Sequence, residues 1–331
     1  MNFLLIGSGN IAIRHQSNLR ELLPSANISV LTNKERYTGE KKEKLACFNE
    51  VYFDRSEIPI TRFDVVLICS PATSHIDDAI FFAEIGMHIF IEKPLSNNLN
   101  RIEELINIIK TNNMVSMVGY PLRFNRSMIA MKDMISAQSL GKIVTVRSTS
   151  FSYLPDWRPG VDYRKTVSAN KELGGGVLLE VSHEIDYLCW LFGEPEIINS
   201  KIQKISDLEI DVEDTAFIDF KFMNKSSPFN CNLSLDFSSS KIIRKCEVIG
   251  EKGELTWDGI NNSLVYNNFN SNRTEHVIEP DRYNHNDMYL SQMKYFIESI
   301  EHQRSNMESI EEAIKTVEII LNVKAMSEYH E

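Results

Sequence analysis

Short apolar runs alternate with helix-like patterns over roughly the first 120 residues of the chain. Runs that suit strands buried on both faces occupy residues 3–6, 28–31, 64–69, 88–91 and 115–119. Between the later runs, residues 76–83 and 102–109 place apolar side chains at the spacing of one helix face. Strands that alternate with helices predict stacked βαβ units and therefore an N-terminal α/β domain built on a doubly wound parallel sheet.

The same patterns predict how several helices begin and what they bury. The helix after the first strand is expected to bury Ile11, Leu19, Leu22 and Leu23. Asn100 and Glu103 have the spacing of an N-cap and its third-position partner at the start of helix 102–109. In the same way, Ser309 and Glu312 predict a capping box that opens the last helix.

The hydrophobic period changes after about residue 143, which marks a second domain. Apolar side chains then alternate with polar ones at Ala216, Ile218, Phe220, Phe222, Cys231, Leu233, Leu235 and Phe237. A period of two is typical of antiparallel strands with one covered face, and residues 250–253 predict a turn between two of them. We therefore expect a domain of residues 1–122 and an α+β domain of residues 123–331, with a large mostly antiparallel sheet and two closing helices.

Composition and charge exclude several classes of protein. The 331 residues are 43% hydrophobic and 24% charged, as in ordinary globular proteins, which excludes a disordered or fibrous chain. The formal net charge of -11 argues against nucleic-acid binding, because phosphate neutralisation needs an excess of Lys and Arg.

Targeting, membrane and metal signals are also missing from the sequence. No apolar run is long enough for a transmembrane helix, and the N-terminus has the pattern of a strand instead of a signal peptide. The cysteines are widely spaced and form no C-x-x-C pair: Cys47, Cys69, Cys189, Cys231 and Cys246. We therefore expect reduced thiols in a cytoplasmic protein, with no zinc or other metal site and no membrane partner.

A glycine turn follows the first predicted strand. Residues 7–12 read Gly-Ser-Gly-Asn-Ile-Ala, a G-x-G-x-x-A pattern between a strand and a helix. In that position Gly7 permits the tight turn, Gly9 lets the backbone approach a pyrophosphate, and Ala12 keeps the helix close to the strand. The helix N-terminus then faces the phosphate charge, so the pattern predicts a Rossmann dinucleotide site that includes Asn10 and Ile11. A tight turn without a ligand is the alternative.

The end of the second predicted strand bears on which nucleotide binds. NAD-type sites usually place Asp or Glu there to hold the ribose hydroxyls, but this chain has Thr32, Asn33 and Lys34. Thr32 and Asn33 can bond a hydroxyl or a phosphate, and Lys34 or Arg36 can pair with a 2′-phosphate. The sequence therefore predicts NAD(P), with NADP slightly favoured, unless these residues are only surface charges.

Two further segments resemble a known family. Residues 64–75 read DVVLICSPATSH, and residues 86–95 read GMHIFIEKPL, a strand that ends in Glu-Lys-Pro. With the glycine turn, they resemble the Gfo/Idh/MocA oxidoreductases, named after glucose–fructose oxidoreductase and inositol dehydrogenase. Residues 119–124, 174–186 and 249–253 resemble later parts of the same family. The resemblance implies nicotinamide-dependent oxidation or reduction of a sugar, cyclitol or similar carbonyl, in a dimer or tetramer packed through the C-terminal sheets.

The resemblance also implies roles for individual residues. Lys93 would bind the reacting oxygen and relay its proton, and Glu92 would orient Lys93 or contact the cofactor. His183 would be the acid/base or a ligand of a substrate hydroxyl, with Asp186 on the same helix face. A core histidine that is satisfied by Asp186 is the alternative.

The chain departs from the family at one of these positions. Many members have Asp four residues before this histidine, whereas here position 179 is Leu and Glu180 stands three residues before His183. Glu180 can replace that Asp if the turn is one residue shorter. Glycines 174–176 would let the chain pass close to the substrate or the nicotinamide, or form a flexible turn.

The segment of residues 155–164 mixes aromatic residues with Arg and Asp. Arg158 and Arg164 suit a carboxylate or phosphate, and Trp157 suits a stacking wall. The segment can equally brace a subunit interface. Arg123 is a further candidate anion contact.

These arguments give two groups of candidate residues. Those expected at the cofactor are Gly7, Gly9, Asn10, Ile11, Thr32, Asn33, Lys34, Ser70, Pro71, His75, Glu92 and Lys93. Those expected at the substrate are Lys93, Tyr120, Arg123, Trp157, Arg158, Arg164, Glu180 and His183, with Lys93, His183 and Glu180 catalytic.

The predicted function is an NAD(P)-dependent oxidoreductase that moves a hydride between nicotinamide and a carbinol or carbonyl carbon of a sugar, nucleotide sugar or cyclitol. Two alternatives remain open. One is a dinucleotide-binding sensor of the same fold that has lost catalysis. The other is a redox-assisted epimerase or lyase, in which the cofactor is oxidised and reduced within one turnover.

Overall fold

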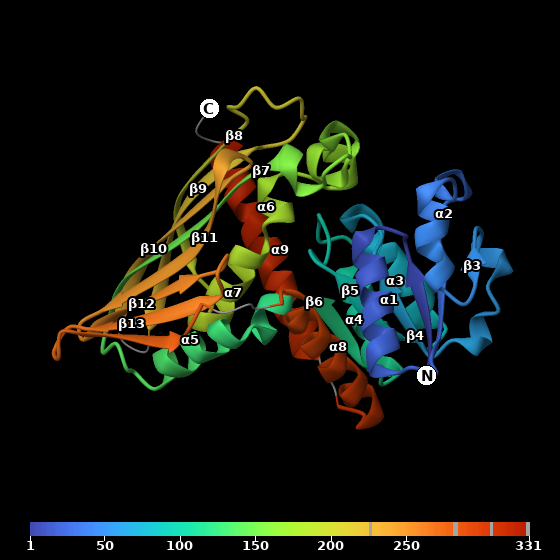
Figure 1. Ribbon diagram of the computed structural model, residues 1–331, viewed down its shortest axis with the longest axis horizontal. Coiled ribbons are helices and arrows are strands. Elements are labelled where there is room, and N and C mark those ends of the chain that lie inside the picture. Colours follow the sequence, from blue (N-terminus) through green and yellow to red (C-terminus); the bar gives the residue numbers. More distant parts are fainter. Residues whose placement is uncertain (225–226, 281–283, 305–306, 329–331) are drawn as a thin grey trace. The chain divides into compact units, whose positions relative to one another are not determined.

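The structure is a computed structural model that describes residues 1–224, 227–280, 284–304 and 307–328. The chain divides into two compact units. The first unit contains Met1–Tyr120 and Tyr289–Val317, and the second contains Pro121–Met288 and the residues from Glu318 onward. Each unit has its own sheet (Figure 1).

The first unit is built on a six-stranded sheet in the order β3-β2-β1-β4-β5-β6, and all its strand pairs are parallel. The strands are β1 (Asn2–Ile6), β2 (Asn27–Leu31), β3 (Val51–Tyr52), β4 (Val65–Ile68), β5 (His88–Glu92) and β6 (Ser116–Gly119). Their side chains are almost all buried, which requires covered faces on both sides. The predicted doubly wound parallel sheet is confirmed.

The helices with residues in this unit are α1 (Asn10–Leu22), α2 (Glu40–Lys44), α3 (His75–Glu84), α4 (Ile102–Thr111), α8 (Asn286–Glu301) and α9 (Met307–Glu328), the last two with residues in both units. The described residues of α2 are exposed, whereas the other helices bury apolar side chains. Single 3-10 turns lie at η1 (Lys34–Arg36), η2 (Leu45–Cys47), η3 (Arg55–Glu57), η4 (Ile60–Arg62) and η5 (Ala72–Ser74). Phe90 of β5 packs edge-on against His15 of α1 and Phe296 of α8, with ring centroids 5.1 and 5.5 Å apart. The core therefore lies between the sheet and these helices.

The buried face of α1 differs from the prediction. Ala12 and Leu19 are buried as an apolar face requires, but Ile11, Leu22 and Leu23 remain partly exposed. Polar side chains take their places in the interior: His15, Gln16 and Asn18. They can be buried there because they find hydrogen-bond partners, such as the Cys47 carbonyl oxygen that accepts from Gln16.

Both predicted capping boxes are wrong. Helix α4 is capped by Arg101, which is left-handed (φ 60°) and makes no side-chain cap hydrogen bond, whereas Asn100 lies in the preceding turn. Helix α9 begins at Met307, so Ser309 lies inside it. The Ser309 hydroxyl instead accepts the backbone N–H of Val118 at 2.9 Å. A tertiary contact therefore uses the side chain that the local pattern assigned to a cap.

The second unit is built on an eight-stranded sheet in the order β14-β13-β12-β11-β7-β10-β9-β8. Its strands are β7 (Ile143–Tyr153), β8 (Glu196–Gln203), β9 (Thr215–Asn224), β10 (Ser227–Asp236), β11 (Ser238–Gly250), β12 (Gly253–Asp258), β13 (Ser263–Asn268) and β14 (Arg273–Ile278). Only the pair of β7 and β10 is parallel among the pairs described. The predicted, mostly antiparallel sheet and its alternating buried positions are confirmed.

Helices α5 (Arg126–Ser136), α6 (Val177–Glu180) and α7 (His183–Phe192) lie along one face of this sheet (Figure 1). An irregular stretch of 3-10 turns follows β7: η7 (Leu154–Trp157), η8 (Tyr163–Lys165), η9 (Val167–Ala169) and η10 (Lys171–Leu173). A further 3-10 turn, η6 (Pro121–Phe124), opens the unit. None of the helices in the described part of the chain is both long and apolar enough to cross a membrane.

Candidate active site

The glycine turn between β1 and α1 has the geometry that a dinucleotide requires. Gly7 has a φ of +102°, and a Cβ atom there would lie 2.7 Å from the Cys69 carbonyl oxygen. Gly9 is the N-cap of α1, where no side chain caps the helix, and a Cβ atom on Gly9 would meet nothing within 4 Å. The exposed N-terminus of α1, with Asn10 and Ile11 as its first residues, therefore borders open space that fits a pyrophosphate.

This difference between the two glycines predicts two different mutant phenotypes. Gly9→Ala should keep the fold, at a cost of less than about 1 kcal/mol for a poorer N-cap. It should nevertheless weaken NADH binding at least ~10-fold, because the methyl group fills the space next to the phosphate. Gly7→Ala should lose both stability and binding, because its Cβ overlaps backbone atoms. Thermal melts and fluorescence titration with NADH measure both effects, and unchanged NADH affinity in Gly9→Ala would contradict the assignment.

The end of β2 lies beside the glycine turn. The Thr32 hydroxyl is 2.6 Å from the Ser8 hydroxyl, so Thr32 joins β2 to the turn. The Asn33 carboxamide accepts the backbone N–H of Glu35 and thereby caps η1. Lys34 is exposed and has no ion pair among the described residues. Of the three predicted residues, Lys34 is therefore the one whose side chain is most available to a 2′-phosphate.

The loop after β4 uses its polar side chains internally. The Ser70 hydroxyl donates to Asp78 at 2.8 Å, and Arg55 also pairs with Asp78. The His75 ring is buried between two backbone carbonyl oxygens, with Nε2 2.7 Å from that of Ser70 and Nδ1 2.9 Å from that of Pro94. Burial lowers the pKa of His75, and the two carbonyls oppose this shift. Ser70 and Pro71 are partly exposed, whereas His75 is enclosed.

Glu92, Lys93 and Pro94 stand at the carboxyl end of β5. The Glu92 carboxylate is buried and lies 2.6 Å from Nε2 of His15 on α1. A Cβ atom on Gly119 would come within 3.1 Å of the same carboxylate, so a larger residue there would have to displace Glu92 by a few tenths of an ångström. Lys93 is partly exposed, and the peptide bond to Pro94 is cis. The residue that directly precedes Lys93 is thus bonded to α1 through its side chain.

In the second unit, Glu180 ends α6 and is held by the irregular stretch after β7. The buried Ser168 hydroxyl donates to Glu180 Oε2 at 2.9 Å. Arg158 donates to the same hydroxyl at 3.4 Å. The structure thus brings two predicted substrate residues, Arg158 and Glu180, to either side of Ser168. His183, the first residue of α7, is half-buried.

Asp186, which the alternative interpretation makes the partner of His183, bonds to Arg123. It is fully buried and accepts two hydrogen bonds from Arg123, at 3.0 Å from Nε and 2.7 Å from Nη2. Burial raises the pKa of Asp186, and the Arg123 guanidinium opposes this shift. The charge of Arg123, a predicted anion contact, is therefore already balanced by a buried carboxylate. Tyr120, the last residue of the first unit, is also buried.

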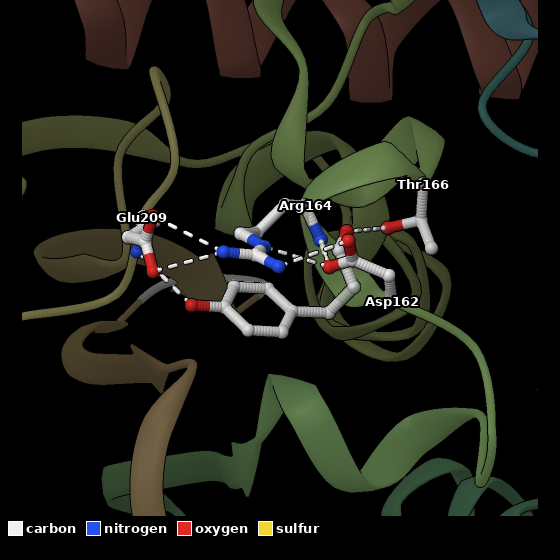
Figure 2. Close-up of polar contacts among 5 residues, drawn as sticks. Asp162, Arg164, Thr166 and Glu209 are labelled. Atoms are coloured by element: carbon white, nitrogen blue, oxygen red, sulfur yellow. Dashed lines mark hydrogen bonds and ion pairs between the residues drawn. The ribbon is translucent and has the colours of Figure 1, made fainter.

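The other predicted substrate residues of the irregular stretch brace it. Trp157 donates to the Ser152 hydroxyl and packs edge-on against Phe237, with ring centroids 4.9 Å apart. Arg164 lies between two carboxylates, Asp162 at 2.8 Å and Glu209 at 3.2 Å (Figure 2). These contacts hold the segment against its own unit.

The triple glycine before α6 has a packing explanation. A Cβ atom on Gly175 would overlap the carbonyl oxygen of Val167. Gly176 has a φ of +106°, and a Cβ atom there would overlap the Glu213 carboxylate, which pairs with Lys324 of α9 at 3.0 Å. Both glycines are therefore required by neighbouring parts of the same unit.

The sequence did not single out His15, Ser168 or Glu213. For His15 a signal existed, because it stands at i+3 from Ala12 and i−4 from Leu19, on the buried face of α1. Ser168 and Glu213 lie in irregular segments, whose side-chain directions no periodicity predicts.

Comparisons with known proteins identify the family of this chain. The sequence profile described as "Oxidoreductase family, NAD-binding Rossmann fold" matches residues 1–120, and that of the "GFO/IDH/MocA C-terminal domain" matches residues 128–256. The chain is 26% identical over 315 residues to myo-inositol 2-dehydrogenase of Thermotoga maritima, covering 91% of this chain and 88% of the relative. It is 24% identical over 287 residues to a scyllo-inositol 2-dehydrogenase (NADP(+)) of Bacillus subtilis, covering 85% and 83%.

A solved structure of levoglucosan dehydrogenase in complex with NADH shares the fold, with a TM-score of 0.84 over 99% of this chain and 97% of that one, at 19% identity. The profiles of both the dinucleotide-binding part and the C-terminal part thus come from a single family. The resemblance carried by the glycine turn and the Glu-Lys-Pro segment is therefore confirmed, and this chain belongs to the Gfo/Idh/MocA oxidoreductases.

Proposed function

We propose that this chain is a cytoplasmic NAD(P)-dependent dehydrogenase or reductase that acts on a CH–OH group of a sugar, nucleotide sugar or cyclitol. One observation carries the proposal: Lys93 follows β5 in the same parallel sheet whose β1 ends in the glycine turn, with only β4 between them. The carboxyl ends of parallel strands share one sheet edge, where α/β proteins bind their ligands. The relatives named as inositol and levoglucosan dehydrogenases support the substrate class.

The proposed chemistry divides among a few residues. The glycine turn and the N-terminus of α1 would hold the pyrophosphate, and a bound nicotinamide would exchange the hydride. The Lys93 ammonium would donate a hydrogen bond to the reacting oxygen and stabilise its developing negative charge. His183 would take the hydroxyl proton in oxidation and return it in reduction. Glu180, oriented by the Ser168 hydroxyl, would bind a neighbouring substrate hydroxyl.

A substrate panel tests this function. Purified protein is mixed with NAD⁺ or NADP⁺ and with inositols, anhydrosugars, aldoses and nucleotide sugars, and the absorbance of reduced nicotinamide is followed. At least one cyclitol or sugar should give a steady rise. Consumption of a substrate without net change in absorbance would indicate the redox-neutral epimerase or lyase instead. Tight NADH binding without turnover of any compound would indicate a sensor.

The end of β2 supports a preference for NADPH within this proposal. Lys34 is exposed, and the tip of the strand, Thr32 and Asn33, provides no carboxylate to hold the ribose hydroxyls. A relative that carries NADP(+) in its name is compatible with this preference.

Lys34→Ala should raise the dissociation constant of NADPH about 10-fold, because a hydrogen bond to a charged group is lost, and leave the dissociation constant of NADH unchanged. Lys42→Ala, an exposed lysine on α2, is the control. Tighter binding of NADH than of NADPH by the unmodified protein would overturn the preference.

We further propose a homodimer or homotetramer formed through the outward face of the eight-stranded sheet. Phe217 and Met223 of β9 are exposed and alternate with the buried positions of that strand. Light scattering of the purified chain measures the mass that tests this proposal.

A further inference from the structure

Buried histidines hold the residues on both sides of Lys93. Glu92, which precedes Lys93, bonds through its side chain to His15. Pro94, which follows it, faces His75 with its backbone carbonyl oxygen. All five residues belong to the first unit, and both histidine rings are almost completely enclosed, at 0% and 1% exposure.

His15 connects Glu92 to the dinucleotide helix. A carboxylate only accepts hydrogen bonds, so the His15 tautomer with hydrogen on Nε2 is the one that bonds to Glu92 across the 2.6 Å contact. The His15 ring packs edge-on against Phe90 and Tyr289, with centroids 5.1 and 6.4 Å away, and the Glu92 carboxylate has Gly119 on its other side. These contacts tie the Glu92 side chain to α1.

His75 connects Pro94 to the loop beside the glycine turn. The ring bridges the Pro94 carbonyl oxygen and that of Ser70, and Ser70 directly follows Cys69, whose carbonyl oxygen abuts Gly7. A neutral imidazole donates through one nitrogen at a time, so the ring bonds both oxygens together only when protonated. In either form it fills the space between the two loops.

We propose that His15 and His75 are positioning residues that fix Lys93 relative to the bound dinucleotide. Each ties one neighbour of Lys93 to an element that forms the cofactor site: α1 in one case, the Ser70 loop in the other. Neither ring is placed to touch the reacting atoms, because both are enclosed by protein. Catalysis requires the lysine backbone to be held, since an error of about 1 Å in the position of a catalytic group can cost ~100-fold in rate. The inference rests on the proposed role of Lys93.

The test replaces each histidine in turn. Leucine removes the ring nitrogens, and glutamine keeps one N–H donor at a similar reach. His88→Gln is the matched control, because His88 is a half-buried histidine of the same unit whose Nδ1 accepts the Val115 N–H at the other end of β5. For each variant we would measure the thermal midpoint, the dissociation constant of NADH, kcat, and the NMR signal of ¹³C-methylated Lys93 in protein without cofactor.

His15→Leu and His75→Leu should lower kcat on the order of 100-fold and shift the Lys93 signal, and both glutamine variants should recover part of each. The affinity for NADH should change far less than kcat. If a leucine variant does not fold, its glutamine variant carries the test through the same two readouts. His88→Gln should lower only the thermal midpoint.

The variants of His15 and His75 could instead lower only the thermal midpoint, as His88→Gln does, and leave kcat and the Lys93 signal unchanged. Both histidines would then act only in packing, and the inference would be overturned. The NMR readout also separates this inference from the function itself, because it needs no turnover. A shifted Lys93 signal in a protein that oxidises no substrate would retain the positioning role and reject the dehydrogenase.

Discussion

Replacing Lys93 with methionine is expected to lower kcat by about 10²- to 10⁴-fold while NADH binding remains unchanged. Methionine has a similar length and fills the partly buried position, but it has no N–H to donate to the reacting oxygen. The contacts of the flanking residues, from Glu92 to His15 and from Pro94 to His75, do not involve the Lys93 side chain and should persist. The loss should therefore fall on the chemical step.

Single-turnover kinetics with the active substrate of the panel, together with fluorescence titration of NADH, separate these two effects. Lys110→Met is the control, because Lys110 is an exposed lysine of the same unit on α4 and pairs only with Glu311 among the described residues. It should retain full activity. A Lys93→Met enzyme with a kcat close to that of the unmodified protein would remove Lys93 from the mechanism.

Replacing Arg123 with methionine is expected to destabilise the fold by about 3–5 kcal/mol, the typical cost of leaving one buried charge without its partner. Asp186 is fully buried and receives both of its described charge-assisted bonds from Arg123, whose side chain is only 16% exposed. The double variant Arg123→Met with Asp186→Leu should recover most of the loss, because it leaves no uncompensated charge. Urea unfolding of the single and double variants measures the difference.

The loss of stability in Arg123→Met should also depend on pH, in the direction that the pKa of Asp186 determines. Burial raises the pKa of Asp186 in the fold above its ordinary value of 3.8, so the folded chain binds this proton more tightly than the unfolded chain. The contribution of Asp186 to stability is therefore largest at low pH and decreases as the pH rises from the pKa of the unfolded chain to that of the folded chain. Removing Arg123 raises the pKa of Asp186 in the folded chain further. The loss of unfolding free energy in Arg123→Met should therefore be smaller at pH 4 than at pH 7.

Arg164→Met is the matched control for this prediction. Arg164 also bonds two carboxylates, Asp162 and Glu209 (Figure 2), but all three side chains are at least 31% exposed. Exposed ion pairs contribute little to stability, so this variant should unfold close to the unmodified protein. If Arg123 acts on the substrate and not on the fold, its methionine variant will raise the KM with no change in unfolding, which contradicts the prediction.

The elements were predictable where a period or a motif determines local structure. The strands that end at Ile6, Ile68 and Glu92 are continuous apolar runs, because a parallel sheet covered on both faces requires them. The two-residue strand β3 carries no such signal and was not predicted. The predicted helix start at Ser309 was wrong for another reason: its hydroxyl accepts a hydrogen bond from Val118, 191 residues away in the chain.

The sequence predicted which residue types belong to the candidate site, but not which side chains they contact. The Glu-Lys-Pro segment pointed to Lys93, but its support comes from His15, 77 residues before Glu92, and from His75, 19 residues before Pro94. Arg123 suited an anionic ligand by type, and the structure gives its charge to Asp186, 63 residues later. A single sequence shows which side chains are polar, whereas burial and long-range pairing decide which of them remain for a ligand.

The place of β7 in its sheet has a consequence for how the chain folds. This strand is the first of the second unit to be synthesised, yet its two neighbours are β10 and β11, and Thr145 bonds to Asn230, 85 residues later. Until both neighbours have left the ribosome, β7 has two open edges, each a template for pairing with another chain. Pairing across such a long loop is also slow. We therefore expect the second unit to be prone to pair with other chains while it is being synthesised, before any cofactor can bind.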